Sequence, residues 1–424
     1  MEYDAVLKRV LQTGKPGKAE RARLLSRVNH ALRQLQESID SSGLKARAML
    51  GGSLSKDTWL SGSSDADIFV RFDYKGFSDR SDGLSDALAP CLEFLRPVRI
   101  HGSRDYFQAR LRGITLEIVP ILNIDRPEEA RNITDISPLH VSWVKAQSSE
   151  AITDEIRLAK AFCKAQRCYG AESYIMGFSG YVLEVMVIHF GSFLKLLRAS
   201  LAWNLNKKTL IDVASKAPKR LNTSKTEGPI IVIDPVQPER NAAAALSMEK
   251  TRCFVSAAHS FLDKPSVSFF KLELPSLASM KKKSLGRKLI VVYLTMPEGK
   301  EDIIGARIVK VTDFIKKGLI SNGFKIICSD WGWDKQRRAE IYFILDPEPL
   351  SEWVRLSGPP LKAGMHVKKF KEKHDSCELV EDKSRIVAIG KRRFRLPERL
   401  ISSLLEDDYI TSRAEKAALK SYKP

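Results

Sequence analysis

The sequence has few cysteines, and none of them lies at the spacing of a metal site. Six cysteines are scattered over 424 residues. They form no CxxC pair, and none lies at zinc-finger distance from paired histidines, so a zinc-finger or zinc-ribbon protein is not expected. Scattered free cysteines in a chain of this length are typical of a reducing compartment.

Long apolar runs are also missing. The longest apolar stretches, near Tyr181–Phe190 and Leu289–Met296, are too short to span a bilayer. The first residues, Met1-Glu2-Tyr3-Asp4, lack the charged and apolar regions of a signal peptide. We find no basic amphipathic anchor, lipidation signal, internal repeat or low-complexity tract. We therefore expect a cytoplasmic protein without a membrane partner.

Acidic residues are too few to balance the basic ones. Lys and Arg outnumber Asp and Glu by 70 to 51, which gives a formal net charge of +19 and a pI of about 9.6. Such a surplus favours a polyanionic partner such as a nucleic acid, although a basic, solvated surface is the simpler alternative. The length suggests about three domains, and the 43% of hydrophobic residues can bury several cores.

The first 142 residues predict a helix followed by a sheet. Apolar residues recur at helical spacing from Ala19 to Ser42. A short strand is expected at Ala46–Leu50, and alternating stretches predict half-buried strands at Ala66–Phe72 and Ile114–Leu122. This order indicates an α/β or α+β domain with a mostly antiparallel sheet over residues 1–142.

Residues 143–262 are predicted to be mainly helical. Ser179 is a good N-cap for an apolar helix, and a loop is expected at Asn222–Gly228. The expected helices are Asp154–Gln166, Gly180–Phe190, Phe193–Asn204 and Ala243–Phe261.

The chain changes character again over residues 263–362. Three adjacent lysines, Lys281, Lys282 and Lys283, precede a β-α-β-β pattern, which suggests a small ferredoxin-like or RRM-like module. Its expected elements are a strand at Lys288–Thr295, a helix at Ile303–Ile320 and strands at Phe324–Ser329 and Ile341–Leu345. Residues 363–424, which contain further basic clusters, form a separate C-terminal segment in this interpretation.

The pattern with the clearest chemistry is a glycine-rich turn followed by two carboxylates. Gly52 and Ser53 allow the backbone to approach a triphosphate closely, and Lys56 adds a positive charge. Asp65 and Asp67 point to the same side of a strand because successive strand residues alternate between faces. Close carboxylates repel each other unless a cation lies between them, and Mg²⁺ prefers oxygen ligands supplied by carboxylates and substrate phosphates.

A third carboxylate is expected from Glu117. Its neighbours Ile118 and Val119 are apolar, so an acid at this position is costly unless it has a use. Taken singly, a Gly-Gly-Ser is usually a turn and an Asp-x-Asp is usually a loop or a solvated face. Their order, together with the third acid, predicts a two-metal site.

Further motifs resemble those of the archaeal class I CCA-adding enzymes, which belong to the DNA polymerase β superfamily of nucleotidyltransferases. They occur in the order of that family, and the resemblance covers at least residues 20–265. The motifs are Gly52–Trp59, Ser137-Pro138-Leu139-His140, Cys168–Glu172, Gly177–Tyr181, and Asp234-Pro235-Val236 with Arg240-Asn241.

The resemblance implies an α+β multidomain architecture. It consists of a polymerase-β-type nucleotidyltransferase head (1–142), a helical neck with the first part of an α/β body (143–262), and a ferredoxin-like or RRM-like tail that grips tRNA (263–362). The last stretch, 363–424, is expected to return to the body. A homodimer is a further possibility.

The same resemblance assigns roles to single residues. Asp65, Asp67 and Glu117 are expected to bind two Mg²⁺ ions, with Glu117 helping to deprotonate the RNA 3′-hydroxyl. The nucleotide-binding residues are expected to be Gly52, Ser53, Lys56, His140, Lys160, Tyr169 and Arg240, and the RNA-binding residues Asn241, Lys281, Lys282 and Lys283. The implied activity is template-independent addition of CCA to tRNA 3′ ends from CTP and ATP.

The chain departs from the family at two of the carboxylates. The family usually has Glu-x-Asp where this chain has Asp65 and Asp67, and Asp where it has Glu117. Some relatives have arginine at the position of Lys56, and lysine lacks its bidentate geometry. Two alternatives remain: another template-independent transferase such as a poly(A) or oligo(A) polymerase, and a catalytically silent RNA-binding module on the same fold.

Overall fold

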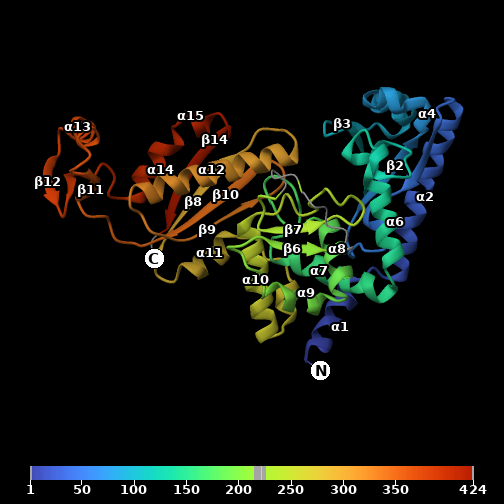
Figure 1. Cartoon of the computed structure of the whole chain (residues 1–424), viewed down its shortest axis with the longest axis horizontal. Helices are drawn as coiled ribbons and strands as arrows, with labels where there is room; N and C mark the ends of the chain where they lie inside the picture. The colour runs from blue at the N-terminus through green and yellow to red at the C-terminus, as the bar shows by residue number, and fades with distance from the viewer. Residues whose placement is uncertain (1, 214–220, 222–225, 423–424) are drawn as a thin grey trace. The chain divides into compact units, whose positions relative to one another are not determined.

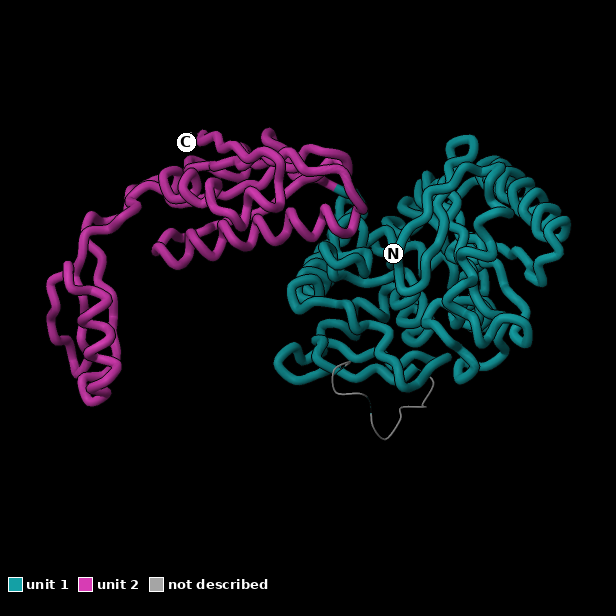
Figure 2. Tube along the Cα trace, turned by 90° about the horizontal axis from the view of Figure 1, so that it is seen from above, with its two compact units in different colours: residues 1–272 teal, residues 273–424 magenta. Residues whose placement is uncertain are grey.

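A computed structural model of the chain describes residues 2–213, 221 and 226–422. It divides into two compact units, residues 1–272 and 273–424 (Figure 2). Residues 222–225 of the loop expected at Asn222–Gly228 lie outside the described residues.

The N-terminal part of unit 1 is built around a five-stranded mixed sheet with the strand order β1-β2-β5-β4-β3 (Figure 1). The expectation of a mostly antiparallel sheet is confirmed, because only the central pair, β2 with β5, is parallel. The strands are β1 (Ala46–Leu50), β2 (Asp65–Phe72), β3 (Val98–Ile100), β4 (Tyr106–Leu111) and β5 (Ile114–Leu122).

The two faces of this sheet are covered by different helices. On one face, Ile68 and Val70 of β2 share a core with Val28 and Leu35 of helix α2 (Lys18–Ser41). On the other face, residues such as Phe69 pack with α6 (Ser137–Gln147). Side chains alternate along a strand, so Asp65 and Asp67 lie on this second face. The connections contain the short helices α3 (Gly52–Ser55), α4 (Tyr74–Phe77) and α5 (Leu84–Leu88).

The remainder of unit 1 is helical and has its own aromatic core. Phe162, Phe193, Phe254 and Phe261 are buried there with their rings in contact. Its elements are α7 (Glu150–Ala165), α8 (Gly180–Phe190), α9 (Phe193–Ser200), α10 (Met248–Asp263) and a two-stranded parallel sheet of β6 (Thr209–Asp212) and β7 (Ile230–Ile233). Helix α10 begins later than predicted because Ser247 caps it, accepting a hydrogen bond from Lys250 N.

One element of the predicted head lies elsewhere. Helix α1 (Glu2–Gly14) packs into the helical core through Leu7 and Val10, and Tyr3 Oη donates a hydrogen bond to the carbonyl of Leu262 at 2.5 Å. The sequence interpretation placed these residues with the sheet domain, because a short amphipathic helix does not reveal which core it covers.

In the part of the chain that the structure describes, no single helix is long and apolar enough to cross a membrane. One bent pair, α8 with α9, meets the length and composition criteria only when the two helices are taken together, with 93° between them.

Unit 2 contains a four-stranded antiparallel sheet in the order β14-β8-β10-β9, which is the strand order of a ferredoxin-like fold (Figure 1). Helices α12 (Glu301–Ser321) and α14 (Pro397–Leu405) pack on one face of it. The other elements are α11 (Leu277–Ser284), β8 (Lys288–Thr295), β9 (Ile326–Trp333), β10 (Arg338–Leu345), α15 (Asp408–Thr411) and β14 (Lys416–Tyr422).

This topology corrects the expected course of the C-terminal segment. Strand β14 pairs with β8 along its whole length and supplies the fourth strand of the sheet. Residues 363–424 therefore belong to unit 2, whereas the sequence interpretation returned them to the body and ended the module at residue 362. Pairing between strands so far apart in sequence leaves no local signal.

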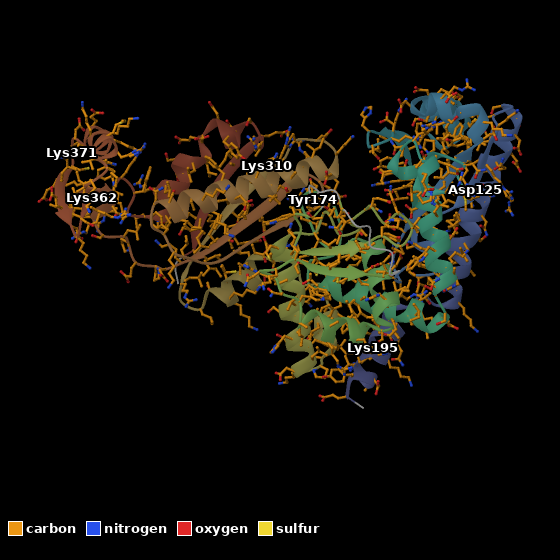
Figure 3. All side chains as sticks on the ribbon, in the orientation of Figure 1. Asp125, Tyr174, Lys195, Lys310, Lys362 and Lys371 are labelled. Carbon is orange, nitrogen blue, oxygen red and sulfur yellow. The ribbon has the colours of Figure 1, made fainter. Side chains whose placement is uncertain are left out.

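A second, smaller module is inserted between β10 and α14. It consists of a three-stranded sheet in the order β11-β13-β12 with the helix α13. Its elements are β11 (Trp353–Pro360), α13 (Gly364–Lys373), β12 (Glu378–Asp382) and β13 (Arg385–Lys391). Lys362 and Lys371, labelled in Figure 3, are exposed on this module.

Candidate active site

Three carboxylates come from neighbouring parallel strands. Asp65 and Asp67 lie two residues apart on β2, so both are on the sheet face opposite α2. Glu117 on β5 is the direct register partner of Asp67. Asp65 is exposed, whereas Asp67 and Glu117 are partly buried. The structure thus brings the three predicted acids to one face of the central strand pair.

The glycine-rich turn lies directly against one of these carboxylates. A Cβ on Gly52 would lie 1.6 Å from Asp67 Oδ2, and Gly52 has a φ of +55°. Gly51 N donates a hydrogen bond to the carbonyl of Asp67 at 2.8 Å and anchors the turn to β2. Ser53, the second residue of the short helix α3, follows at once. Only glycine at position 52 leaves room for the Asp67 carboxylate.

Burial raises the pKa of Asp67, and the neighbouring Asp65 raises it further, while Lys56 and Lys160 lower it. A carboxylate pair in this situation favours a bound cation. The donors are all oxygens, which suits Mg²⁺, and this ion is usually held by one or two carboxylates plus substrate phosphates. Among the described residues, no three His, Cys, Asp or Glu side chains form a preassembled metal cage. The fit rests instead on the three carboxylates that share one sheet face and on the Gly52 turn that lies directly against Asp67.

Glu117 is held from the adjacent strand β4. Gln108 Nε2 donates a hydrogen bond to Glu117 Oε1 at 3.3 Å. Burial raises the pKa of Tyr106, and the negative charge of Glu117 adds to this effect, so the phenol remains a hydrogen-bond donor in this region. The hydrogen bond from Gln108 thus helps to orient the Glu117 carboxylate.

Lys56 and Lys160 meet at a carboxylate that the sequence interpretation missed. Glu184 of α8 accepts hydrogen bonds from Lys56 Nζ at 2.6 Å and from Lys160 Nζ at 2.7 Å. Burial would raise the pKa of Glu184, but the two lysines outweigh it and lower this pKa to about 2. The apolar surroundings of Glu184 in the sequence were a usable signal, because a lone acid in an apolar helix is costly without a partner.

The end of the same turn is anchored to α7. The buried Arg157 donates to both the carbonyl and Oδ1 of Asp57, at 2.5 and 2.7 Å, and to the carbonyl of Trp59 at 3.1 Å. Asp57 has a φ of +53°, an unfavourable region for a side-chain-bearing residue. The guanidinium therefore stabilises a turn conformation that aspartate does not favour by itself.

A second cluster surrounds the carboxylate of Asp234. Arg240 Nη1 and Tyr181 Oη donate hydrogen bonds to it, at 2.8 and 2.9 Å. His140 Nε2 lies 3.0 Å from Asp234 Oδ2 without being aligned for a hydrogen bond, and its ring lies 4.2 Å from that of Tyr181. Burial raises the pKa of Asp234, but His140, the N–H of Val236 and Arg240 outweigh it and lower this pKa to about 2.

This cluster brings together two of the predicted nucleotide-binding residues, His140 and Arg240. The residues between them, Asp234 and Tyr181, belong to the family motifs but had been assigned no role. Asp234 is fully buried, whereas the side chain of Arg240 keeps 29% of its surface exposed. The arrangement leaves Arg240 available to a ligand while its carboxylate partner fixes its position.

Tyr169, another predicted nucleotide-binding residue, lies near Lys160. Its hydroxyl and Lys160 Nζ both approach Gly180, at 2.9 and 3.8 Å from the position that a Cβ there would take. Burial raises the pKa of Tyr169, and Glu184 adds to this effect. Because Gly180 has no side chain, α8 leaves room there for the Tyr169 hydroxyl and the Lys160 ammonium group.

The placement of Asn241 does not support its predicted contact with RNA. It is 2% exposed, and its side-chain Oδ1 accepts hydrogen bonds from the backbone N–H groups of Val232 and Ala243. These contacts make it a structural residue beside β7. Lys281, Lys282 and Lys283 are exposed at the end of α11 in unit 2, with Lys281 over the ring of Tyr422 at 4.6 Å.

The mixed sheet with its paired carboxylates and glycine-rich turn defines a nucleotidyltransferase. Residues 32–140 match the family model described as the nucleotidyltransferase domain. Residues 154–271 match the tRNA nucleotidyltransferase second domain, and residues 285–413 match the CCA-adding enzyme C-terminal domain.

Curated relatives identify the family within the nucleotidyltransferases. The chain is 34% identical to the CCA-adding enzyme of Nanoarchaeum equitans, over 81% of this chain and 83% of that protein. It is 31% identical to the CCA-adding enzyme of Sulfurisphaera tokodaii, over 93% of this chain and 89% of that protein. The chain belongs to the family of CCA-adding enzymes and is itself an enzyme.

A solved structure is similar in fold over about two thirds of the chain. A variant of the Cid1 poly(U) polymerase bound to MgATP matches with a TM-score of 0.50 and 12% identity, over 64% of this chain and 99% of that chain. At this identity the likeness concerns the fold alone.

Proposed function

We propose that this protein adds or repairs the 3′-terminal CCA of tRNA, using CTP and ATP without a nucleic-acid template. One observation carries the proposal. Asp65, Asp67 and Glu117 share a sheet face directly beside the Gly52 turn, in a chain that belongs to the CCA-adding enzymes. The reaction is an in-line attack of the RNA 3′-hydroxyl on the α-phosphate of the nucleotide, with release of pyrophosphate.

The three carboxylates would hold the metal ions beside the reacting hydroxyl. Two Mg²⁺ ions bound by Asp65, Asp67 and Glu117 would supply activation of the 3′-hydroxyl and stabilisation of the leaving pyrophosphate. Glu117, oriented by Gln108, accepts the proton of the hydroxyl. The Gly52 turn brings backbone close to the triphosphate, and Lys56 carries the positive charge that binds it.

The choice of base is assigned to the Asp234 cluster. Arg240 and His140 hold hydrogen-bond donors next to a fixed carboxylate, so their positions are set before the nucleotide arrives. Hydrogen bonds to the Watson–Crick edge of cytosine or adenine from fixed side chains replace the selection that a template would provide. A site that is built for such contacts rejects bases that leave its polar groups unpaired.

Unit 2 is proposed to bind the tRNA away from its 3′ end. Lys281, Lys282 and Lys283 on α11 are exposed, and so are Lys362 and Lys371 on the inserted module (Figure 3). Phosphate contacts of this kind add affinity without reading sequence.

The experiment uses a tRNA transcript that ends before CCA, with Mg²⁺ and with CTP and ATP supplied singly and together. The expected product with both nucleotides has two C residues and then one A, while CTP alone gives only the two C residues. A long A tail would instead indicate the poly(A) polymerase alternative. Transcript binding without any addition would indicate the silent RNA-binding module.

A further inference from the structure

Glu184 is a buried acid that contacts two of the predicted nucleotide-binding residues, Lys56 and Lys160. It lies on α8 with no exposed surface. One carboxylate oxygen accepts from Lys56, and the other accepts from both Lys160 and the hydroxyl of Thr58, the latter at 2.6 Å. Three elements of unit 1 are therefore joined at one carboxylate: α7, α8 and the turn after α3.

The two lysines differ in the donors that they retain. Lys160 Nζ donates to Glu184 and to both the carbonyl and the hydroxyl of Thr58, at 2.7, 3.2 and 2.9 Å. These three acceptors match the three N–H donors of an ammonium group. Lys56 Nζ has Glu184 as its acceptor at 2.6 Å, and its side chain keeps 9% of its surface exposed. Lys56 is therefore the lysine whose remaining N–H groups can donate hydrogen bonds to a ligand.

The charges of the cluster favour an anionic ligand. Two ammonium groups share one carboxylate, so the cluster carries an excess positive charge in a buried place. A buried charge without compensation is unfavourable. Lys56 is the C-cap of the short helix α3, and the first residue of α3, Gly52, lies against Asp67. The positive charge of Lys56 therefore lies close to the carboxylate face. A triphosphate bound there would place negative charge beside the two ammonium groups.

We propose that Glu184 is a positioning residue of the triphosphate site, which holds Lys56 and Lys160 side by side before the nucleotide binds. This inference rests on the proposed function, because Glu184 would position the two lysines for CTP and ATP. Without Glu184, Lys160 would be buried beside a second cation and Lys56 would lose its tether. The triphosphate would then have to order both side chains itself.

The test compares Glu184→Gln and Glu184→Asp with wild type in nucleotide addition and in equilibrium binding of ATP with Mg²⁺ in the absence of RNA. For Glu184→Gln we expect KM and Kd for the nucleotide to rise about tenfold or more. We expect kcat to change much less, because the lysines bind the triphosphate alike in the ground state and the transition state. Glu184→Asp keeps the negative charge but has a shorter side chain, so its KM should lie between those of wild type and Glu184→Gln.

Glu155→Gln is the matched control. Glu155 is a partly buried acid of α7 that accepts from the backbone N–H of Phe193 at 2.7 Å. No contact between it and either lysine is seen among the described residues, so its substitution should leave KM unchanged. If Glu184→Gln does not fold, the Glu184→Asp variant alone decides, with a KM above that of wild type as the expected result.

The inference is overturned if the folded Glu184 variants keep the wild-type KM, if they bind the nucleotide more tightly, or if only kcat falls. Tighter binding would mean that Glu184 merely competes with the triphosphate. Failure of the proposed function is a separate result, because wild type would then bind ATP without adding CCA, and the binding comparison would still test Glu184.

Discussion

The Asp67 carboxylate occupies the space that a side chain at Gly52 would need: a Cβ on Gly52 would lie 1.6 Å from Asp67 Oδ2. The absence of a side chain at position 52 therefore leaves the space that the Asp67 carboxylate occupies. The turn and the strand act as one unit, joined by the hydrogen bond from Gly51 N to the carbonyl of Asp67.

Gly52→Ala is expected to lower kcat/KM for nucleotide addition on the order of 100-fold, because displacement of a reacting group by about 1 Å has such an effect. Gly62→Ala is the matched control. Gly62 also has a positive φ, of +79°, but a Cβ there would meet no atom within 4 Å. Steady-state kinetics of both variants provide the measurement, and equal losses of activity would mean that backbone strain rather than contact with Asp67 is responsible.

Asp234→Asn should destabilise unit 1 in a pH-dependent way. The pKa of Asp234 is lowered from 3.8 to about 2, because its partners outweigh burial. A folded pKa below the unfolded value gives stability that is present above pH 3.8 and is lost as the pH falls towards 2. The lowered pKa corresponds to about 2 kcal/mol at neutral pH.

Urea unfolding of wild type and Asp234→Asn at pH 7 and near pH 3 tests this account. The difference in the free energy of unfolding should shrink at the lower pH. A difference that stays constant between the two pH values would show that the carboxylate charge is not what stabilises the cluster.

Substitution of Lys281, Lys282 and Lys283 by alanine should weaken tRNA binding and its dependence on salt. Each phosphate that a lysine neutralises contributes about 0.9 to the slope of log Kd against log salt for duplex nucleic acid. The triple variant should therefore lose up to about 3 units of slope, with kcat at saturating tRNA little changed. An unaltered slope, measured by filter binding at several salt concentrations, would exclude these lysines from the interface.

Much of the catalytic face could be predicted from sequence. Alternation along β2 is local information, and it predicted that Asp65 and Asp67 point to the same side. Glu117 was predicted as the third acid from its apolar neighbours, and the register of β5 with β2 then places it opposite Asp67. Glu184 was missed although the same physical argument applied to it, since an acid within an apolar helix needs a partner. Its partner on α7, Lys160, had been predicted to contact the nucleotide and not an acid of the protein.

Other features depend on contacts that sequence does not reveal locally. Strand β14 joins β8 across more than 100 residues, so the ferredoxin-like sheet was predicted without its last strand. Asn241 follows Arg240 in a family motif, yet it turns inward to two backbone N–H groups of the β7 region. Adjacent residues of one motif can thus have different roles, and only the packing around them distinguishes these roles.

The carboxylates of β2 and β5 are proposed to carry out nucleotide transfer to the tRNA 3′ end. A single-turnover assay with a tRNA transcript ending in CC, ATP and Mg²⁺ tests this proposal most directly, comparing wild type, Asp67→Ala and Asp73→Ala. Asp73 lies just after β2, where it caps α4 through Gly76 N, and serves as the control acid. We predict addition of one A by wild type and Asp73→Ala, and a rate at least about 1,000-fold lower for Asp67→Ala with tRNA binding retained. Near-normal A addition by a folded Asp67→Ala protein would contradict the account.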